Sequence, residues 1–105
     1  MRIKKYDKLV RDRIPDIIRA QGKKMSVVVA DDDEYRKRLI DKLQEEFDEY
    51  KRDGTTEELA DMLEVIRAII KCDQLSWDEL EQVRIRKKNQ RGGFEKRLIL
   101  EHVTE

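Results

Sequence analysis

The chain of 105 residues is 46% charged and 38% hydrophobic, and its 24 basic residues balance its 24 acidic ones. This length has room for one domain, spanning residues 1–105, but the low apolar content leaves little to bury, so a monomer is expected to be marginally stable. The balanced charge provides no overall field that would attract nucleic acid, and we expect no partner of that class.

Further classes are excluded by what the chain lacks. No stretch approaches the roughly 20 apolar residues of a membrane span, and the charged N-terminal stretch lacks the apolar centre of a signal peptide. We therefore expect a cytoplasmic protein with no membrane partner. Cys72 is the single cysteine and His102 the single histidine. These counts exclude an internal disulfide, a cysteine-based metal centre and a ferritin-like di-iron site.

Proline, glycine and β-branched residues predict the first two elements. Pro15 near a first turn and Gly22 beyond the last one favour a short helix whose N-cap is Asp12 or Ile14. The β-branched run Val27–Val29 that follows is typical of a short strand.

Three capping patterns predict three longer helices. Each places a Ser, Thr or Asp three residues before a Glu, and the pairs are Asp31 with Glu34, Thr55 with Glu58, and Ser76 with Glu79. The first helix is expected to run to about Arg52, where the turn Asp53-Gly54 folds it antiparallel to the second. The third is expected to end before Gly92-Gly93.

The predicted fold is mainly α. It is a helical bundle completed by oligomerisation, with at most a small two-stranded β addition in which Leu98–Leu100 pairs with Val27–Val29. Oligomerisation is expected because seven apolar residues cover nearly half of the second long helix, more than one neighbouring helix can bury. These residues are Leu59, Met62, Leu63, Val65, Ile66, Ile69 and Ile70.

Two acidic clusters flank the predicted turn and are brought together by it. On a wheel of about 100° per residue, Glu46 lies at the border of the apolar stripe of the first long helix, Glu49 comes next, and Glu45 points further away. The stripe consists of Leu39, Leu43, Phe47 and Tyr50. On the second long helix Glu58 lies inside the apolar arc and Asp61 at its edge.

Ionised carboxylates beside a hydrophobic core lower the stability of the fold unless a cation compensates their charge. Oxygen-only ligands suit Mg²⁺, with Mn²⁺ as a substitute, so Glu46, Glu49, Glu58 and Asp61 are the predicted metal ligands. A structural alternative stays open, in which Glu58 serves only as a helix cap. In the same alternative Glu46 and Glu49 pair with Lys42 or Arg52 on the helix surface.

Basic residues gather at the end of the third long helix. Arg84, Lys88 and Arg91 follow one stripe, from which they could bind phosphate oxygens. The alternative is that they only complement the helix dipole at its C-terminus, with Gly92 as the stop signal. Composition alone favours the second interpretation.

The acidic pattern resembles the metal-binding signature of the MazG-like all-α nucleoside triphosphate pyrophosphohydrolases, which include the phosphoribosyl-ATP pyrophosphohydrolases. The similarity rests on Lys42-Leu43-x-Glu45-Glu46-x-x-Glu49 followed by Glu58-Leu59-x-Asp61. Residues 6–15 and the stretch Lys88-x-x-Arg91-Gly92-Gly93-Phe94 are similar to those of a small single-domain branch of this group. One departure is the short connection from Tyr50 to Glu57.

The resemblance implies a Mg²⁺-dependent hydrolase that converts a nucleoside triphosphate to a monophosphate and pyrophosphate, as in the removal of non-standard nucleotides. It also implies a homodimer or higher homo-oligomer. Glu45 or Glu49 is the expected general base. The expected phosphate-binding residues, all basic, are Arg11, Lys42, Arg84, Lys88 and Arg91.

Two other classes of function remain as alternatives. The first is a small helical protein-interaction module whose metal site is degenerate or absent. The second, nucleic-acid binding through residues 84–97, is weaker, because the acidic middle of the chain would repel phosphate in the absence of metal.

Overall fold

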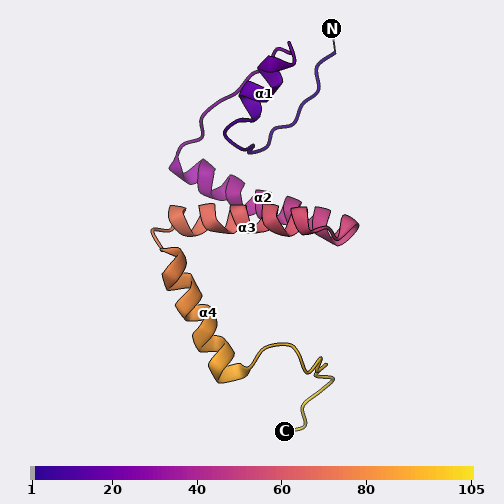
Figure 1. The fold of residues 1–105 in the computed structure, drawn as a ribbon, viewed down its shortest axis with the longest axis vertical. Coiled ribbons are helices and arrows are strands. Elements are labelled where there is room, and N and C mark those ends of the chain that lie inside the picture. The colour runs from indigo at the N-terminus through magenta and orange to yellow at the C-terminus, as the bar shows by residue number, and fades with distance from the viewer. Residues whose placement is uncertain (1) are drawn as a thin grey trace.

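The computed structural model describes residues 2–105 and shows a mainly helical chain (Figure 1). Its helices, in chain order, are α1 (Ile14–Ala20), α2 (Asp32–Asp53), α3 (Thr56–Cys72) and α4 (Trp77–Arg91). The prediction of a mainly α protein is therefore confirmed. Among the described helices, none combines the length and the apolar character needed to cross a lipid bilayer.

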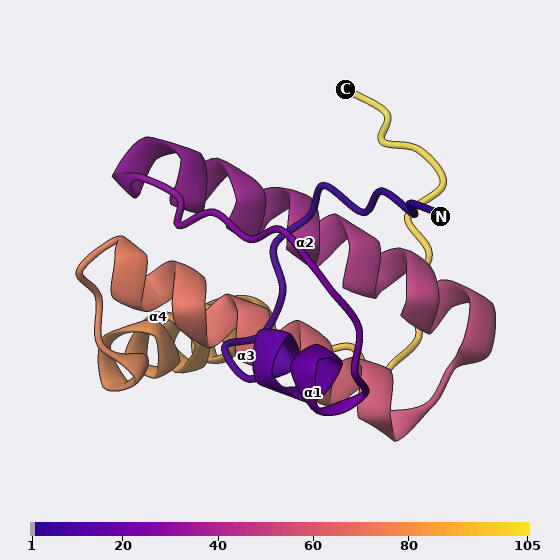
Figure 2. The same ribbon diagram turned by 90° about the horizontal axis from the view of Figure 1, so that it is seen from above.

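Helices α2 and α3 form an antiparallel hairpin and make the most extensive contact between elements (Figures 1 and 2). Gly54 ends α2 in the left-handed conformation, with φ of 66°, and its N–H donates to the carbonyl of Tyr50 at 2.7 Å. Glycine adopts this φ without steric cost, so a sharp reversal fits between the helices. The hairpin places the two acidic clusters, residues 45–49 of α2 and residues 58–61 of α3, on either side of its turn.

Local caps fix where these helices begin. The predicted capping box of α3 is complete, because the Thr55 side chain accepts from the Glu58 N–H while the Glu58 side chain accepts from the Thr55 N–H. In α2 only one half forms. Asp31 accepts from the Glu34 N–H at 2.8 Å, whereas the Glu34 carboxylate accepts from Arg38 Nε at 2.7 Å. Ser76 caps α4 as predicted.

The N-cap predicted for the first helix is wrong. Arg13, rather than Asp12 or Ile14, occupies that position, and its side chain makes no capping hydrogen bond. Pro15 lies in the first turn as expected, where its missing N–H leaves one donor fewer to satisfy. This short helix thus starts without a side-chain cap.

The predicted β addition does not form within the described chain. Residues 27–29 and 98–100 have no regular secondary structure, and five of these six side chains are 80–96% exposed. The two segments lie on opposite sides of the α2/α3 hairpin along the long axis of the molecule (Figure 1). A strand requires a partner for its N–H and C=O groups, and neither segment reaches one.

Few apolar side chains are buried. Leu39, Val65 and Ile70 are the buried hydrophobic residues of the described chain, and all three lie in the hairpin. The radius of gyration is 18.7 Å, whereas a compact domain of this length has about 13 Å. The accessible surface is 10295 Å², against about 6,200 Å² expected for a compact monomer of 12.7 kDa. The single chain is an open arrangement of helices.

Candidate functional site

Glu46 is the centre of the candidate site. Helix α2 directs its side chain toward α3, and the residue is only 7% exposed. Its Oε1 lies 3.4 Å from Lys42 Nζ, while Oε2 is buried and has no hydrogen-bond partner among the described residues. A buried carboxylate oxygen without a partner loses its hydration and gains nothing in return. Such an atom calls for a proton or a cation.

The electrostatic surroundings of Glu46 point the same way. Burial raises its pKa most, and the adjacent Glu49 carboxylate and the negative charge of Asp61 raise it further. The Lys42 ammonium opposes this rise but does not cancel it. Three carboxylates of the predicted ligand set therefore act on one another across the α2/α3 contact.

Asp61 stands at the rim of this cluster. Its Oδ1 accepts a hydrogen bond from Arg11 Nη2 at 2.7 Å, and its side chain remains partly exposed. Arg11 belongs to the segment before α1, so the N-terminal part of the chain reaches over to α3. A surface pair of this kind contributes roughly 0–1 kcal/mol and can be exchanged for another partner.

Glu58, the fourth predicted ligand, is engaged elsewhere. Its Oε2 accepts from the Thr55 N–H at 3.0 Å and from Thr55 Oγ1 at 2.8 Å. The capping alternative considered for this residue is thus the arrangement observed. In residues 2–105, no group of three or more Asp, Glu, His or Cys side chains converges in a geometry that would hold a metal ion. The donor chemistry suits a hard divalent cation, but the carboxylates are not gathered into a finished site.

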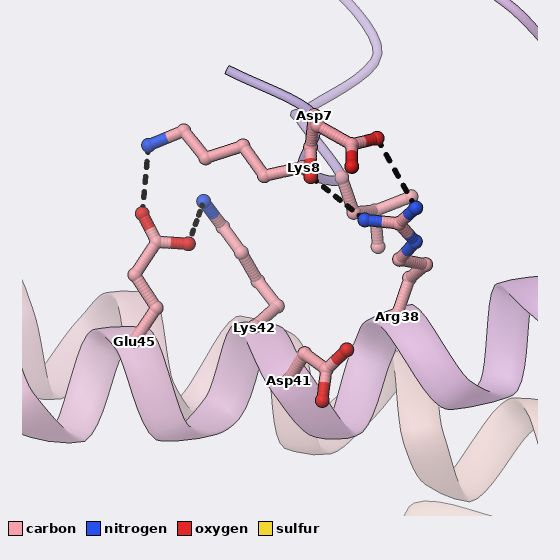
Figure 3. Close-up of a pocket in the computed structure, with 7 residues that line it drawn as sticks. Asp7, Lys8, Arg38, Asp41, Lys42 and Glu45 are labelled. Atoms are coloured by element: carbon pink, nitrogen blue, oxygen red, sulfur yellow. Dashed lines mark hydrogen bonds and ion pairs between the residues drawn. The ribbon is translucent and has the colours of Figure 1, made fainter. Parts of the chain in front are cut away.

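A row of alternating charges, Lys8, Glu45 and Lys42, connects the N-terminal segment to α2 (Figure 3). Lys42 in turn contacts Glu46. Lys8 Nζ lies 2.7 Å from Glu45 Oε1, and Lys42 Nζ lies 3.2 Å from Glu45 Oε2. Partial burial raises the pKa of Glu45, but the hydrogen bonds from the two lysines outweigh it and hold the pKa below its usual range. The hydrogen bond to Glu45 likewise raises the pKa of Lys8. Both Glu45 oxygens are occupied, which makes this carboxylate a poor proton acceptor.

The same segment closes a small pocket of about 130 Å³ against α2 (Figure 3). Arg38 anchors it by donating to the Asp7 carbonyl at 2.7 Å and to Asp7 Oδ1 at 3.2 Å. Seven residues line the pocket, with three basic and three acidic side chains among them: Asp7, Lys8, Leu9, Arg38, Asp41, Lys42 and Glu45. Lys8 and Arg38 were not among the predicted site residues. Lys8 does lie within residues 6–15, one of the stretches that carry the family resemblance, and this similarity was the sequence signal that could have indicated it.

The predicted basic stripe is not brought to the acidic cluster within one chain. Helix α4 diverges from the α2/α3 hairpin, so its last turn lies away from both helices (Figure 1). Arg84 pairs with Glu81 on its own helix. Lys88 and Arg91 are exposed, and the Gly92 N–H donates to the Lys88 carbonyl at 2.7 Å, as at a simple helix end. Lys42 and Arg11 are the predicted phosphate ligands that lie beside the carboxylates, Lys42 at Glu46 and Arg11 at Asp61.

Comparisons of the chain with models of protein families, with curated proteins and with solved structures gave no match. The resemblance to pyrophosphohydrolases therefore stays a prediction from sequence, and the geometry around Glu46 is the independent ground for a function.

The opposite pKa shifts of the two adjacent glutamates predict opposite effects of pH. Because the folded pKa of Glu46 is raised, its ionisation costs stability above that pKa and costs nothing below its unfolded value near 4.5. In metal-free protein, Glu46→Gln should therefore raise the free energy of unfolding at pH 7, by about 1 kcal/mol. The gain should fade as the pH falls toward 4.5, as followed by denaturant titration.

Glu45→Gln is the matched control. The folded pKa of Glu45 is lowered, so the ionised residue contributes stability at pH 7 that is lost as the pH falls through the folded value. This variant should be less stable than the wild type at neutral pH and should approach it in acid. Equal effects of the two substitutions at pH 7 would contradict the charge arrangement described for the site.

Proposed function

We propose that the protein is a Mg²⁺-dependent nucleoside triphosphate pyrophosphohydrolase, with Mn²⁺ as a substitute metal. The observation that carries the proposal is the buried, unpartnered Oε2 of Glu46 beside Glu49 and Asp61. A helical surface does not need three interacting acids next to its core, whereas a divalent cation that serves phosphates does. The family resemblance supplies the reaction, cleavage between the α and β phosphates.

Each side chain of the cluster has a role in this proposal. Glu46, Glu49 and Asp61 hold the cation, and Glu58 joins them once it leaves Thr55. When bound, the cation would supply compensation for the charge of the phosphate oxygens and would make a water molecule more acidic. Glu49, and not Glu45, would be the proton acceptor, because Glu45 is held by two lysines and has a lowered pKa.

Two basic residues position the acids in this proposal. Lys42 binds Glu46 Oε1 and so leaves Oε2 directed to the ligand. Arg11 holds Asp61 while no cation is bound. Arg11, once released from Asp61, would be available to bind a phosphate oxygen of the substrate.

The complete site belongs to a homo-oligomer in this proposal. The accessible surface of the chain exceeds that of a compact monomer by about 4,000 Å², which is enough for a large interface between copies. Because α4 points away from its own acidic cluster, Lys88, Arg91 and Arg84 serve the cluster of a neighbouring copy. The expected setting is the cytoplasm, where removal of non-standard nucleotides would use this activity.

A screen for pyrophosphate release tests the function. Nucleoside triphosphates with standard and modified bases would be incubated with the protein and Mg²⁺, and at least one should yield monophosphate and pyrophosphate in equal amounts. Calorimetric titration with Mg²⁺ and Mn²⁺ accompanies the screen. If no metal binds even with a non-hydrolysable triphosphate present, the enzyme proposal fails. The helical interaction module, for which the ion pairs at Asp61 and Glu45 are the supporting observation, then replaces it.

The basic end of α4 offers a further prediction. If Lys88 and Arg91 bind the triphosphate, replacing either by Ala should lower kcat/KM by about 1.5–3 kcal/mol of transition-state stabilisation, with little change in melting temperature. If they only complement the helix dipole, stability should fall by about 0.3–1 kcal/mol and the kinetics should be unchanged. Arg91→Lys keeps the charge but not the planar two-pronged donor. Wild-type kinetics in Arg91→Ala and Arg91→Lys would remove this arginine from the site.

A further inference from the structure

Two segments of the chain have the composition of strands but no partner. Val28 and Val29 are 88% and 96% exposed, and Leu98, Ile99 and Leu100 are 80–87% exposed. Between residues 2 and 105, the backbone groups of residues 24–30 and 98–105 make no backbone hydrogen bond. Exposed β-branched residues next to free N–H and C=O groups form an open template for strand pairing.

The two segments cannot pair within one chain in the observed arrangement. One leads from α1 into α2, and the other follows α4, on the opposite side of the α2/α3 hairpin (Figure 1). The molecule is 64 Å long, and this separation runs along its longest axis. A partner strand for either segment must therefore come from another molecule.

We propose that residues 25–30 of one copy pair with residues 98–101 of a second copy in an antiparallel two-stranded ladder. The ladder rests on the homo-oligomer of the proposed function and specifies how its copies are linked. In a symmetric dimer the contact occurs twice, because each chain supplies both segments. Each chain then pairs with a strongly exposed apolar segment of the other.

The charges that flank the segments select the antiparallel direction. Lys23-Lys24 precedes the first segment and Asp31-Asp32 follows it, while Lys96-Arg97 precedes the second and Glu101 ends it. Antiparallel pairing sets the two lysines near Glu101 and the two aspartates near Lys96-Arg97. Parallel pairing would set like charges against each other at the lysine end, which is unfavourable across strands.

Area and chemistry identify the partner as a second copy. The surplus surface of about 4,000 Å² per chain exceeds the roughly 1,000–2,500 Å² that each chain of an obligate homodimer buries, so one interface of that size fits within it. Complementary segments occur on the same chain, so the exchange closes on itself in a dimer. An unrelated protein would have to match both segments and both flanking charge pairs.

Hydrogen exchange with mass spectrometry tests the ladder. In the assembled wild type, amides of residues 25–30 and 98–101 should exchange roughly tenfold more slowly than free coil. Proline removes an N–H donor, and adjacent N–H groups point to opposite sides of a strand. One of Val28→Pro and Val29→Pro, and one of Ile99→Pro and Leu100→Pro, should therefore remove protection from both segments. Val28→Thr, which keeps the β-branch, should retain it.

Mixing the two effective proline variants separates exchange between copies from pairing within a chain. In a mixed dimer, the intact second segment of one chain meets the intact first segment of the other, so protection should return to about half of those peptides. Pairing within a chain restores none, and that result overturns the proposal. Assembled protein without protection overturns the ladder but leaves the oligomer standing. A folded monomer by light scattering overturns both.

Discussion

Glu46→Gln and Asp61→Asn should each lower turnover by at least about 100-fold under saturating Mg²⁺, while the protein stays folded. Each substitution removes a charge that the proposed metal site uses and that the metal-free protein must otherwise tolerate. Asp61→Asn also removes the Arg11 ion pair, but a partly exposed pair contributes only about 0–1 kcal/mol. Pyrophosphate release and circular dichroism measure the two expectations separately.

Glu45→Gln is the control for these variants, since it removes a neighbouring carboxylate of the same helix. Its loss of activity should be clearly smaller than that of Glu46→Gln, because Glu45 is bound by Lys8 and Lys42 and lies away from the unpartnered oxygen. Wild-type turnover in Asp61→Asn would refute the proposed metal site. If Glu45→Gln lost more activity than Glu46→Gln, the face of α2 assigned to the site would be wrong.

The hairpin and its buried acid were open to prediction because their signals are local. Gly54 and the capping residues Asp31 and Thr55 act within a few residues of the turns they form. The position of Glu46 beside the apolar stripe follows from helical periodicity, which needs no tertiary information. The stripe itself was less accurate at Phe47, which is 44% exposed in the single chain.

Contacts across long stretches of chain could not be predicted in the same way. Lys8 meets Glu45 across 37 positions and Arg11 meets Asp61 across 50, and such pairs leave no periodic pattern. Glu58 had two chemically sound roles, as a cap and as a ligand. The choice depends on whether Thr55 or a cation binds the Glu58 carboxylate, and in the structure Thr55 binds it.

The strand prediction separates propensity from pairing. Val27–Val29 and Leu98–Leu100 have strand-forming composition, and that assessment needs only the local sequence. A ladder also needs two segments to meet, which depends on the directions of α2 and α4 and on how copies assemble. The strands are missing because the two segments do not meet within the single chain, where they lie on opposite sides of the α2/α3 hairpin.

The apolar arc of α3 should lie between subunits, so a charge placed there should dissociate the assembly. Leu63→Asp is the sharpest variant, because Leu63 is 45% exposed in the single chain and contributes little to the hairpin itself. Stranding a carboxylate in the interface should weaken association by about 3 kcal/mol, or more than roughly 100-fold. Ile66→Asp should dissociate the protein as well, and because Ile66 is less exposed, it should also destabilise the hairpin.

Ala60→Asp supplies the matched control, since it adds the same charge to α3 at an exposed position outside the arc. Light scattering at micromolar concentration should show an oligomer for the wild type and for Ala60→Asp, and smaller particles for Leu63→Asp. Circular dichroism should show that Leu63→Asp keeps its helices, so that lost assembly is not mistaken for unfolding. A well-folded wild-type monomer, or a Leu63→Asp oligomer as stable as the control, would refute burial of this arc between copies.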